Sequence, residues 1–277
     1  MTRWWIAVLL AGVAVAGCTT LPPPRASPYH SSDADLSVTR ILHGSVILEM
    51  HGTRVLVDPW FNSGYMVRQT EPLGLVPDGL PPLAAVLLTH GHPDHFDADA
   101  LAKLSATVPN AVAPAALHDR LVKLGFRNVT SLGWWEHVQI DGIDVVAVPA
   151  RPNMQENGYV LSAAGTTAYV AGDTQPPPEL VDIATRFPDI DAALLPIGGL
   201  RVLGFRREMN AEEAAETAAR LHPRRVIPIG YGAGGGFPVH AYASDPVAAF
   251  VAACKRQGIE DSRVVVLQPG ESWHYYR

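Results

Sequence analysis

Cysteine and charged residues are scarce in this chain of 277 residues. Two cysteines are too few for the disulfide framework of a small secreted domain. Charged residues make up 17% of the chain, and the formal net charge is -6 at pH 7. Nucleic-acid binders draw their affinity from cationic contacts with phosphates, so this charge argues against that class. Hydrophobic residues make up 48% of the chain, which excludes a disordered protein and suits a large buried core.

The sequence also lacks an apolar run long enough to cross a membrane, which takes about 20 residues. Its run from Trp4 to Gly17 follows the single positive charge of Arg3 and has the length of a secretory signal. The end of this run, Val15-Ala16-Gly17-Cys18, resembles the lipobox of bacterial lipoproteins. That resemblance implies cleavage before Cys18 and lipidation of its thiol. The alternative is an ordinary signal peptide, or a short anchor helix, with an incidental cysteine.

Residues 18–36 are rich in Pro, Ser and Thr, a composition that buries little and predicts a semi-rigid tether. Residue 19 is Thr rather than Asp, which in Gram-negative lipoproteins implies sorting to the outer membrane. The sequence therefore predicts a signal peptide over residues 1–17, a tether over 18–36 and one domain over 37–277. The predicted localisation is that of an exported lipoprotein, held at the outer membrane by its lipid anchor and facing the periplasm.

The rest of the chain alternates short β-branched or Leu-rich runs with helical patterns. The predicted strands are 37–42, 45–50, 53–57, 85–89, 138–140, 143–148, 159–162, 168–171, 192–195, 226–229 and 264–267. The predicted helices are 97–105, 114–124, 178–186, 211–221 and 245–257, with Asn210 as the N-cap of the fourth. Strands outnumber helices roughly two to one, and helices follow strands in both halves, which predicts a mixed α/β sandwich in one domain.

Histidine, in contrast, is plentiful: the chain has 11, and three of them lie together. His90, His92 and His95 form the pattern His-x-His-x-Asp-His with Asp94, directly after the apolar run 85–88. A strand that ends in a loop can hold the side chains of residues i and i+2 on one side. Neutral imidazole and carboxylate are ligands that Zn, Fe and Mn accept. The pattern therefore predicts a metal site at the end of this strand.

The same pattern resembles the metal-binding motif of the metallo-β-lactamase superfamily, whose hydrolases are αββα sandwiches with a dinuclear metal site at one sheet edge. The resemblance assigns His90 and His92 to one metal, and Asp94 and His95 to the other. Gly172-Asp173-Thr174 is similar to the family's Gly-Asp-Thr, which makes Asp173 the ligand that bridges both metals. The expected cofactor is one or two divalent ions, with Zn favoured and Mn or Fe as alternatives.

Four further segments narrow the resemblance to one branch of the superfamily. Residues 43–49, 54–59, 195–199 and 209–214 are similar to the ascorbate-phosphate lactonases and to N-acyl-phosphatidylethanolamine phospholipase D-like hydrolases. This match places His43 and Asp58 beside the site, where they would support the metal ligands. It also implies a small-molecule or lipid substrate.

The chain departs from this branch at three positions where the branch carries histidine. Pro152 and Gly230 stand in place of two metal ligands, and Glu208 stands in place of a third histidine. Each lost imidazole should weaken metal binding. Polar residues near these positions are either substitute ligands or solvated loop residues. These residues are Asn153, Gln155, Glu156, Glu208 and His240.

Two functions follow from this ligand set. In the first, the chain is a hydrolase whose metal-bound hydroxide attacks an ester, a lactone or a phosphodiester, while Asp94 orients the nucleophile and passes a proton to the leaving group. In the second, the protein has lost turnover with the ligands at Pro152 and Gly230, and it acts in binding or scaffolding. The persistence of the motif and of Asp173 favours the hydrolase. Cys254 lies in an apolar helical run and is expected to be buried rather than catalytic.

Overall fold

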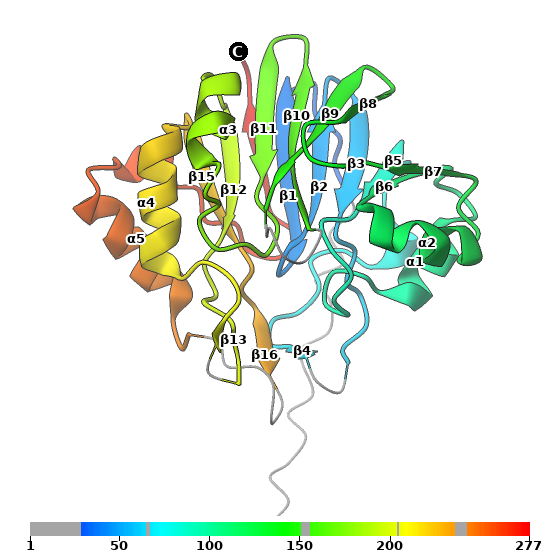
Figure 1. Ribbon diagram of the computed structural model, residues 1–277, viewed down its shortest axis with the longest axis horizontal. Coiled ribbons are helices and arrows are strands. Elements are labelled where there is room, and N and C mark those ends of the chain that lie inside the picture. The colour runs from blue at the N-terminus through cyan, green and yellow to red at the C-terminus, as the bar shows by residue number, and fades with distance from the viewer. Residues whose placement is uncertain (1–28, 65–66, 151–155, 204, 236–242) are drawn as a thin grey trace, which may run out of the picture.

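Two β-sheets packed face to face form the centre of the molecule (Figure 1). This computed structural model describes residues 29–64, 67–150, 156–203, 205–235 and 243–277. The first sheet has the strand order β17-β1-β2-β3-β5-β6-β7, with bounds β1 Leu36–Leu42, β2 Ser45–Met50, β3 Thr53–Val57, β5 Ala85–Leu87, β6 Asn110–Ala113, β7 Asn128–Ser131 and β17 Ser272–Tyr275. The second has the order β15-β12-β11-β10-β9-β8, with bounds β8 His137–Ile140, β9 Ile143–Pro149, β10 Asn157–Ala163, β11 Thr166–Val170, β12 Ala192–Pro196 and β15 Arg225–Ile229. Two small ribbons complete the strands: β13 Arg201–Val202 with β14 Phe205–Arg206, and β4 Val67–Gln69 with β16 Ala233–Gly235.

Each sheet is antiparallel in one part and parallel in the other. In the first sheet β1, β2 and β3 are antiparallel, whereas β3, β5, β6 and β7 run parallel. In the second, β8 to β11 are antiparallel, and β11, β12 and β15 run parallel. Parallel neighbours end at the same edge of a sheet, and this is the edge at which open α/β sheets bind ligands.

Helices cover the outer face of each sheet (Figure 1). Their bounds are α1 Ala98–Leu104, α2 His118–Lys123, α3 Leu180–Arg186, α4 Ala211–Leu221 and α5 Pro246–Arg256. One apolar cluster fills the space between the sheets and includes Leu48 from the first sheet and Leu194 from the second. A second lies under α1 and α2 and includes Leu56, and a third lies under α3, α4 and α5 and includes Phe250. The layers are therefore helix, sheet, sheet and helix, which confirms the predicted αββα sandwich in one domain.

The central strands are buried on both faces. In β2, Val46 and Leu48 pack between the sheets, while Ile47 packs under the helices. Such a strand reads as an unbroken apolar run, because no side chain faces water. Burying each of these side chains contributes about 1.5–3 kcal/mol to the free energy of unfolding.

Several predicted elements have the observed bounds. The structure has β2, β3 and α4 at the residues predicted for them. Asn210 caps α4, since its Oδ1 accepts hydrogen bonds from the amides of Glu212 and Glu213 at 3.0 Å. The Glu213 carboxylate in turn accepts one from the Asn210 amide at 3.2 Å, which completes a capping box.

Two predicted elements differ from the structure. The strand predicted at 264–267 is absent, because Val264 forms only an isolated bridge with Val226. The helix predicted at 114–124 begins as a tight 3-10 turn, in which the Leu117 amide donates to the Pro114 carbonyl, and becomes α-helical only at His118.

The last residues of the predicted tether lie against the domain. The Tyr29 hydroxyl donates to the Glu49 carboxylate at 2.5 Å, Ala34 is buried, and the Asp35 amide donates to the Tyr275 carbonyl. The first strand begins at Leu36, one residue before the predicted start of the domain. Residues 1–28, and with them the predicted signal peptide and Cys18, lie outside the described residues.

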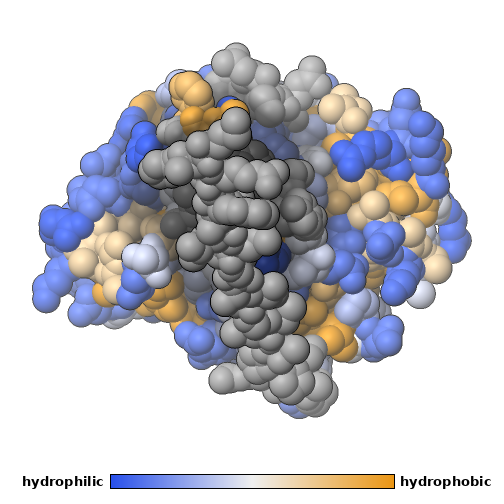
Figure 2. All heavy atoms as spheres, turned by 90° about the horizontal axis from the view of Figure 1, so that it is seen from below, coloured by the Kyte–Doolittle hydropathy of each residue, from blue (hydrophilic) through white to orange (hydrophobic). Residues whose placement is uncertain are grey.

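Within the described part of the chain, no helix combines the length and the apolar character needed to cross a membrane. The lower face of the molecule, seen in Figure 2, carries hydrophilic groups on both flanks with apolar groups among them.

Candidate metal centre

The loop after β5 carries the histidine motif and is fixed at both ends. The Asn157 amide of the second sheet donates to the Thr89 carbonyl at 3.0 Å. Beyond the motif, the Asp97 side chain caps α1. Between them, the His92 carbonyl accepts hydrogen bonds from the amides of His95 and Phe96, which closes a tight turn. The motif side chains are therefore held between a strand and a helix.

Four imidazole rings gather at this loop. The ring centroids of His90 and His95 are 4.1 Å apart, those of His90 and His92 are 4.6 Å apart, and those of His43 and His95 are 5.1 Å apart. His43 comes from the turn after β1, and its ring meets the Trp60 ring edge-on. His43, His90 and His95 are buried, while His92 is half-buried.

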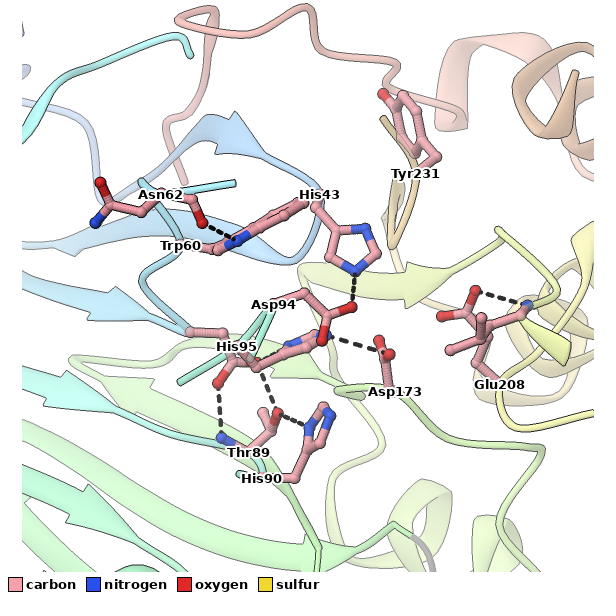
Figure 3. A network of polar contacts seen from close by, with 12 residues as sticks. His43, Trp60, Asn62, Thr89, His90, Asp94, His95, Asp173, Glu208 and Tyr231 are labelled. Atoms are coloured by element: carbon pink, nitrogen blue, oxygen red, sulfur yellow. Dashed lines mark hydrogen bonds and ion pairs between the residues drawn. The ribbon is translucent and has the colours of Figure 1, made fainter. Parts of the chain in front are cut away.

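Asp58, which follows β3, fixes the orientation of two of these rings. They are the rings of His90 and His95, which lie beside Thr89 in Figure 3. Its carboxylate accepts hydrogen bonds from the Thr89 amide at 2.8 Å, the Thr89 hydroxyl at 2.6 Å and His95 Nδ1 at 2.9 Å. The Thr89 hydroxyl uses its one proton in the hydrogen bond to Asp58. In the contact between His90 Nδ1 and Thr89 Oγ1, at 2.9 Å, His90 Nδ1 is therefore the donor. Both rings consequently present Nε2 to the centre. Hydrogen-bond partners on the other ring nitrogen commonly orient metal-binding histidines in this way.

Two further carboxylates face the rings. Asp173 follows β11 of the opposite sheet, and its Oδ2 lies 3.2 Å from His95 Nε2. Asp94 Oδ2 lies 3.5 Å from His43 Nε2. The groups His43, Asp94, His95 and Asp58, His90, His95 each bring three ligand atoms within 4.8 Å of one another. Loops from both sheets therefore converge on one buried cluster.

The charges in this cluster are strongly coupled. Burial, reinforced by the His95 charge, holds the pKa of His90 well below its ordinary value, so His90 is neutral. Burial also disfavours the His95 cation, but the carboxylates of Asp173 and Asp58 outweigh it and raise the pKa of His95 well above its ordinary value. Burial opposes the ionisation of both carboxylates. The His95 charge nevertheless lowers the pKa of Asp173, and the hydrogen bond from His43 lowers the pKa of Asp94. The metal-free protein thus keeps a proton between His95 and its carboxylates.

The residues present fit a divalent cation. The Nε2 atom of His90 is buried and has no hydrogen-bond partner among the described residues, although His90 is neutral and its Nε2 carries the lone pair. Imidazoles and carboxylates are the ligands that Zn, Mn and Fe take in proteins. A cation would replace the proton on His95 and satisfy both rings.

The positions where histidine is missing are only partly described. Pro152, Asn153, Gln155 and His240 lie outside the described residues. Glu156 and Glu208 are 4% and 0% exposed, so the interpretation of these two as solvated loop residues is wrong.

Sequence reasoning missed two residues that shape the cluster. Thr89 precedes the motif and was not singled out, although it connects Asp58 with His90. Gly44 allows the His95 ring to approach the backbone, since a Cβ there would lie 2.9 Å from His95 Cε1. A Thr at a strand end and a Gly in a turn carry no chemical signal in a single sequence, which is why both were passed over.

Comparison with protein families shows to which family the chain belongs. The β-lactamase superfamily domain matches residues 53–231. The chain belongs to this superfamily. Over 247 residues it is 31% identical to the UPF0173 metal-dependent hydrolase of Pyrococcus furiosus, with 86% of this chain and 98% of that relative covered. It is thus also a member of the UPF0173 family of metal-dependent hydrolases.

Solved structures show that this superfamily member has the fold of known hydrolases. Igni18, a metallo hydrolase from Ignicoccus hospitalis, matches with a TM-score of 0.68 at 22% identity, covering 87% of this chain and 99% of that one. An isothiocyanate hydrolase from Delia radicum gut bacteria matches with a TM-score of 0.68 at 20% identity, covering 87% of this chain and 100% of that one. At these identities the likeness concerns the fold alone.

The predicted localisation is wrong. The relatives that match over most of their length are archaeal metal-dependent hydrolases, and neither they nor the structural neighbours show a signal peptide or a lipid anchor. The prediction of an exported lipoprotein at the outer membrane rested on the apolar run after Arg3, on its lipobox-like end at Cys18 and on Thr19, all in a segment that lies outside the described residues.

Cys254 lies in α5, away from the cluster. It is free, 1% exposed and packed in the apolar layer under the helices of the second sheet. Burial raises the pKa of its thiol to about 11. It is a core residue of this superfamily member, as the apolar run around it predicted.

Proposed function

We propose that this metal-dependent hydrolase cleaves an ester, a lactone or a phosphodiester of a small molecule or lipid. The proposed metal ligands are His90, His92, Asp94, His95 and Asp173. The observation that carries the proposal is the buried, neutral imidazole of His90, whose Nε2 lone pair faces the cluster without a partner among the described residues. The sequence similarity to ascorbate-phosphate lactonases and phospholipase D-like hydrolases supports the substrate class.

A bound divalent cation would act as a Lewis acid and lower the pKa of a coordinated water, so that the water becomes a nucleophile near neutral pH. Zn, Mn and Fe all suit the donor set. The chain's own residues supply the positioning. Asp58 holds His95 Nδ1, and through Thr89 it fixes the tautomer of His90.

Asp94 is the proposed proton carrier. Its carboxylate is buried, lies 3.5 Å from His43 Nε2 and stays ionised because His43 and His95 lower its pKa against the effect of burial. An ionised carboxylate at this place accepts a hydrogen bond from the attacking water and orients it. The proton that it gains is then available to the leaving group.

The test combines metal content with hydrolysis. The purified protein, reconstituted with Zn²⁺ or Mn²⁺, is assayed by elemental analysis and with bis(4-nitrophenyl) phosphate and a γ-lactone. We expect one to two equivalents of metal and turnover of at least one substrate, both lost in His90→Ala. His137→Ala is the matched control, since His137 is 65% exposed and pairs only with Asp144 among the described residues.

Less than about 0.1 equivalent of metal after reconstitution would refute the proposed centre. Metal binding at full stoichiometry without turnover of any ester, lactone or phosphodiester would instead favour the alternative, a binding or scaffolding protein on a hydrolase fold.

A further inference from the structure

Gly230 directly follows β15 and leaves a space that another side chain fills. Its backbone has φ +72°, and its amide donates to the His43 carbonyl at 3.2 Å, so the residue lies beside the imidazole cluster. A Cβ at this position would lie 2.9 Å from the Pro196 side chain and 3.2 Å from Glu208 Oε2. The space that a longer side chain would need at position 230 is therefore occupied by the Glu208 carboxylate.

Glu208 reaches this space from the segment that precedes α4. Its side chain is fully buried, and Oε1 accepts a hydrogen bond from the Leu200 amide at 3.0 Å. The neighbouring residue is tied to the loop of Asp173, because the Met209 amide donates to the Thr174 carbonyl at 2.7 Å. The hydrogen bond from Leu200 and the full burial of the side chain hold the carboxylate inside the protein.

The second oxygen of this carboxylate lies against a proposed metal ligand. Glu208 Oε2 is buried and accepts no hydrogen bond from a donor group among the described residues, and its polar neighbour is the Asp173 carboxylate. It faces Asp173, on the side away from His95 (Figure 3). Two buried carboxylates placed side by side repel each other when both are ionised, and a cation bound between them would relieve that repulsion.

We propose that Glu208 is a metal ligand of this centre and that its carboxylate replaces the imidazole missing at Gly230. The inference rests on the proposed function, because it needs a cation bound by Asp173. A carboxylate in place of an imidazole also shifts the preference of a site toward oxygen-favouring ions. We therefore expect Mn²⁺ to compete with Zn²⁺ better than at a site of histidines alone.

The test compares metal binding by Glu208→Gln with binding by the wild-type protein, using equilibrium dialysis against Zn²⁺ and against Mn²⁺. Glu208→Gln keeps the shape of the side chain and removes its charge, and we expect it to weaken the binding of one ion by about tenfold to a hundredfold. The loss should be larger for Mn²⁺ than for Zn²⁺. Glu216→Gln is the control, because Glu216 lies exposed on α4, the helix that follows Glu208. Circular dichroism with chelator present checks that both variants are folded.

A crystal structure of the wild-type protein loaded with Mn²⁺ tests the same point without a variant. We expect a Glu208 oxygen about 2.0–2.2 Å from an ion that also contacts Asp173. Equal affinity in Glu208→Gln and wild type, or a carboxylate out of reach of every ion, would overturn the role of Glu208 while leaving the proposed function intact. Absence of metal from the wild-type protein would overturn both.

Discussion

At the scale of single residues, the centre depends on Thr89 as much as on the histidines. The Thr89 hydroxyl donates to Asp58 and accepts from His90 Nδ1, so it determines which nitrogen of His90 carries the lone pair. Thr89→Val keeps the shape and removes the hydroxyl. We expect it to lower metal affinity by about tenfold, measured by competition with a chromogenic chelator.

Thr166→Val is the matched control for this prediction. Thr166 is equally buried in a strand, and its hydroxyl has no hydrogen-bond partner among the described residues. We expect metal affinity to be unchanged in this variant. Unchanged affinity in Thr89→Val as well would show that the His90 tautomer is set by other contacts.

A second residue-scale prediction concerns pH. In the metal-free protein the pKa of His95 is raised above its ordinary 6.5, so its contribution to the free energy of unfolding is complete below pH 6.5 and is lost as the pH rises through the raised value. The pKa of Glu208 is raised above 4.5, so folding favours its protonated form and this contribution also falls with rising pH.

We therefore expect the Tm of the protein in chelator to fall as the pH rises above 6.5, because both groups lose protons that the fold favours. With metal bound the trend should be weaker, because the cation takes the place of those protons. Differential scanning fluorimetry across this range measures both curves. A metal-free Tm that rises through the same range would contradict the assignment of charges.

Cys254 gives a third prediction at this scale. Its pKa of about 11 and its burial leave almost no accessible thiolate at neutral pH. In a Cys18→Ser background, we expect Ellman's reagent to label Cys254 only after the protein is unfolded in guanidinium. Rapid labelling of the native protein would show that α5 opens readily.

At the scale of elements, the sequence predicts best where local signals and burial agree. The helix α4 carries Asn210 and Glu213 as a capping box and has its predicted bounds. The strands β6, β7 and β17 were missed, because their sequences are short, and those of β7 and β17 are largely polar. Their pairing is determined by the rest of the sheet: β17 lies beside β1, which is more than 200 residues earlier in the chain.

The capping box predicts a stability effect of its own. Asn210→Ala removes the acceptor for two amides of α4 and should lower the free energy of unfolding by about 1 kcal/mol. Urea unfolding followed by circular dichroism measures it. Asp245→Ala, which removes the cap of α5 at its exposed end, should have a similar effect on stability and none on metal affinity.

At the scale of the whole molecule, the centre joins the two sheets. His90 and His95 belong to the loop after β5, whereas Asp173 follows β11 in the opposite sheet. The motif residues are contiguous, so a single sequence reveals them. The relation between Gly230 and Glu208 is not visible in the sequence, because it arises from the space that two distant segments share.

Because its ligands come from both sheets, metal binding should stabilise the entire fold. At a free metal concentration about 100 times Kd, the expected gain is about 2.7 kcal/mol. Thermal unfolding with and without metal measures it, and Asp173→Asn should abolish most of the gain. Asp144→Asn is the control, since Asp144 lies at the surface beside His137. A gain that survives in Asp173→Asn would mean that the first sheet binds the ion alone.

The shared space at Gly230 also couples two positions of the chain in evolution. A Cβ at position 230 would lie 3.2 Å from Glu208 Oε2, closer than most such contacts, so the carboxylate would have to shift before a side chain fits there. Substitutions at positions 230 and 208 should therefore occur together. Related chains with a large residue at position 230 are expected to carry a residue other than glutamate at position 208.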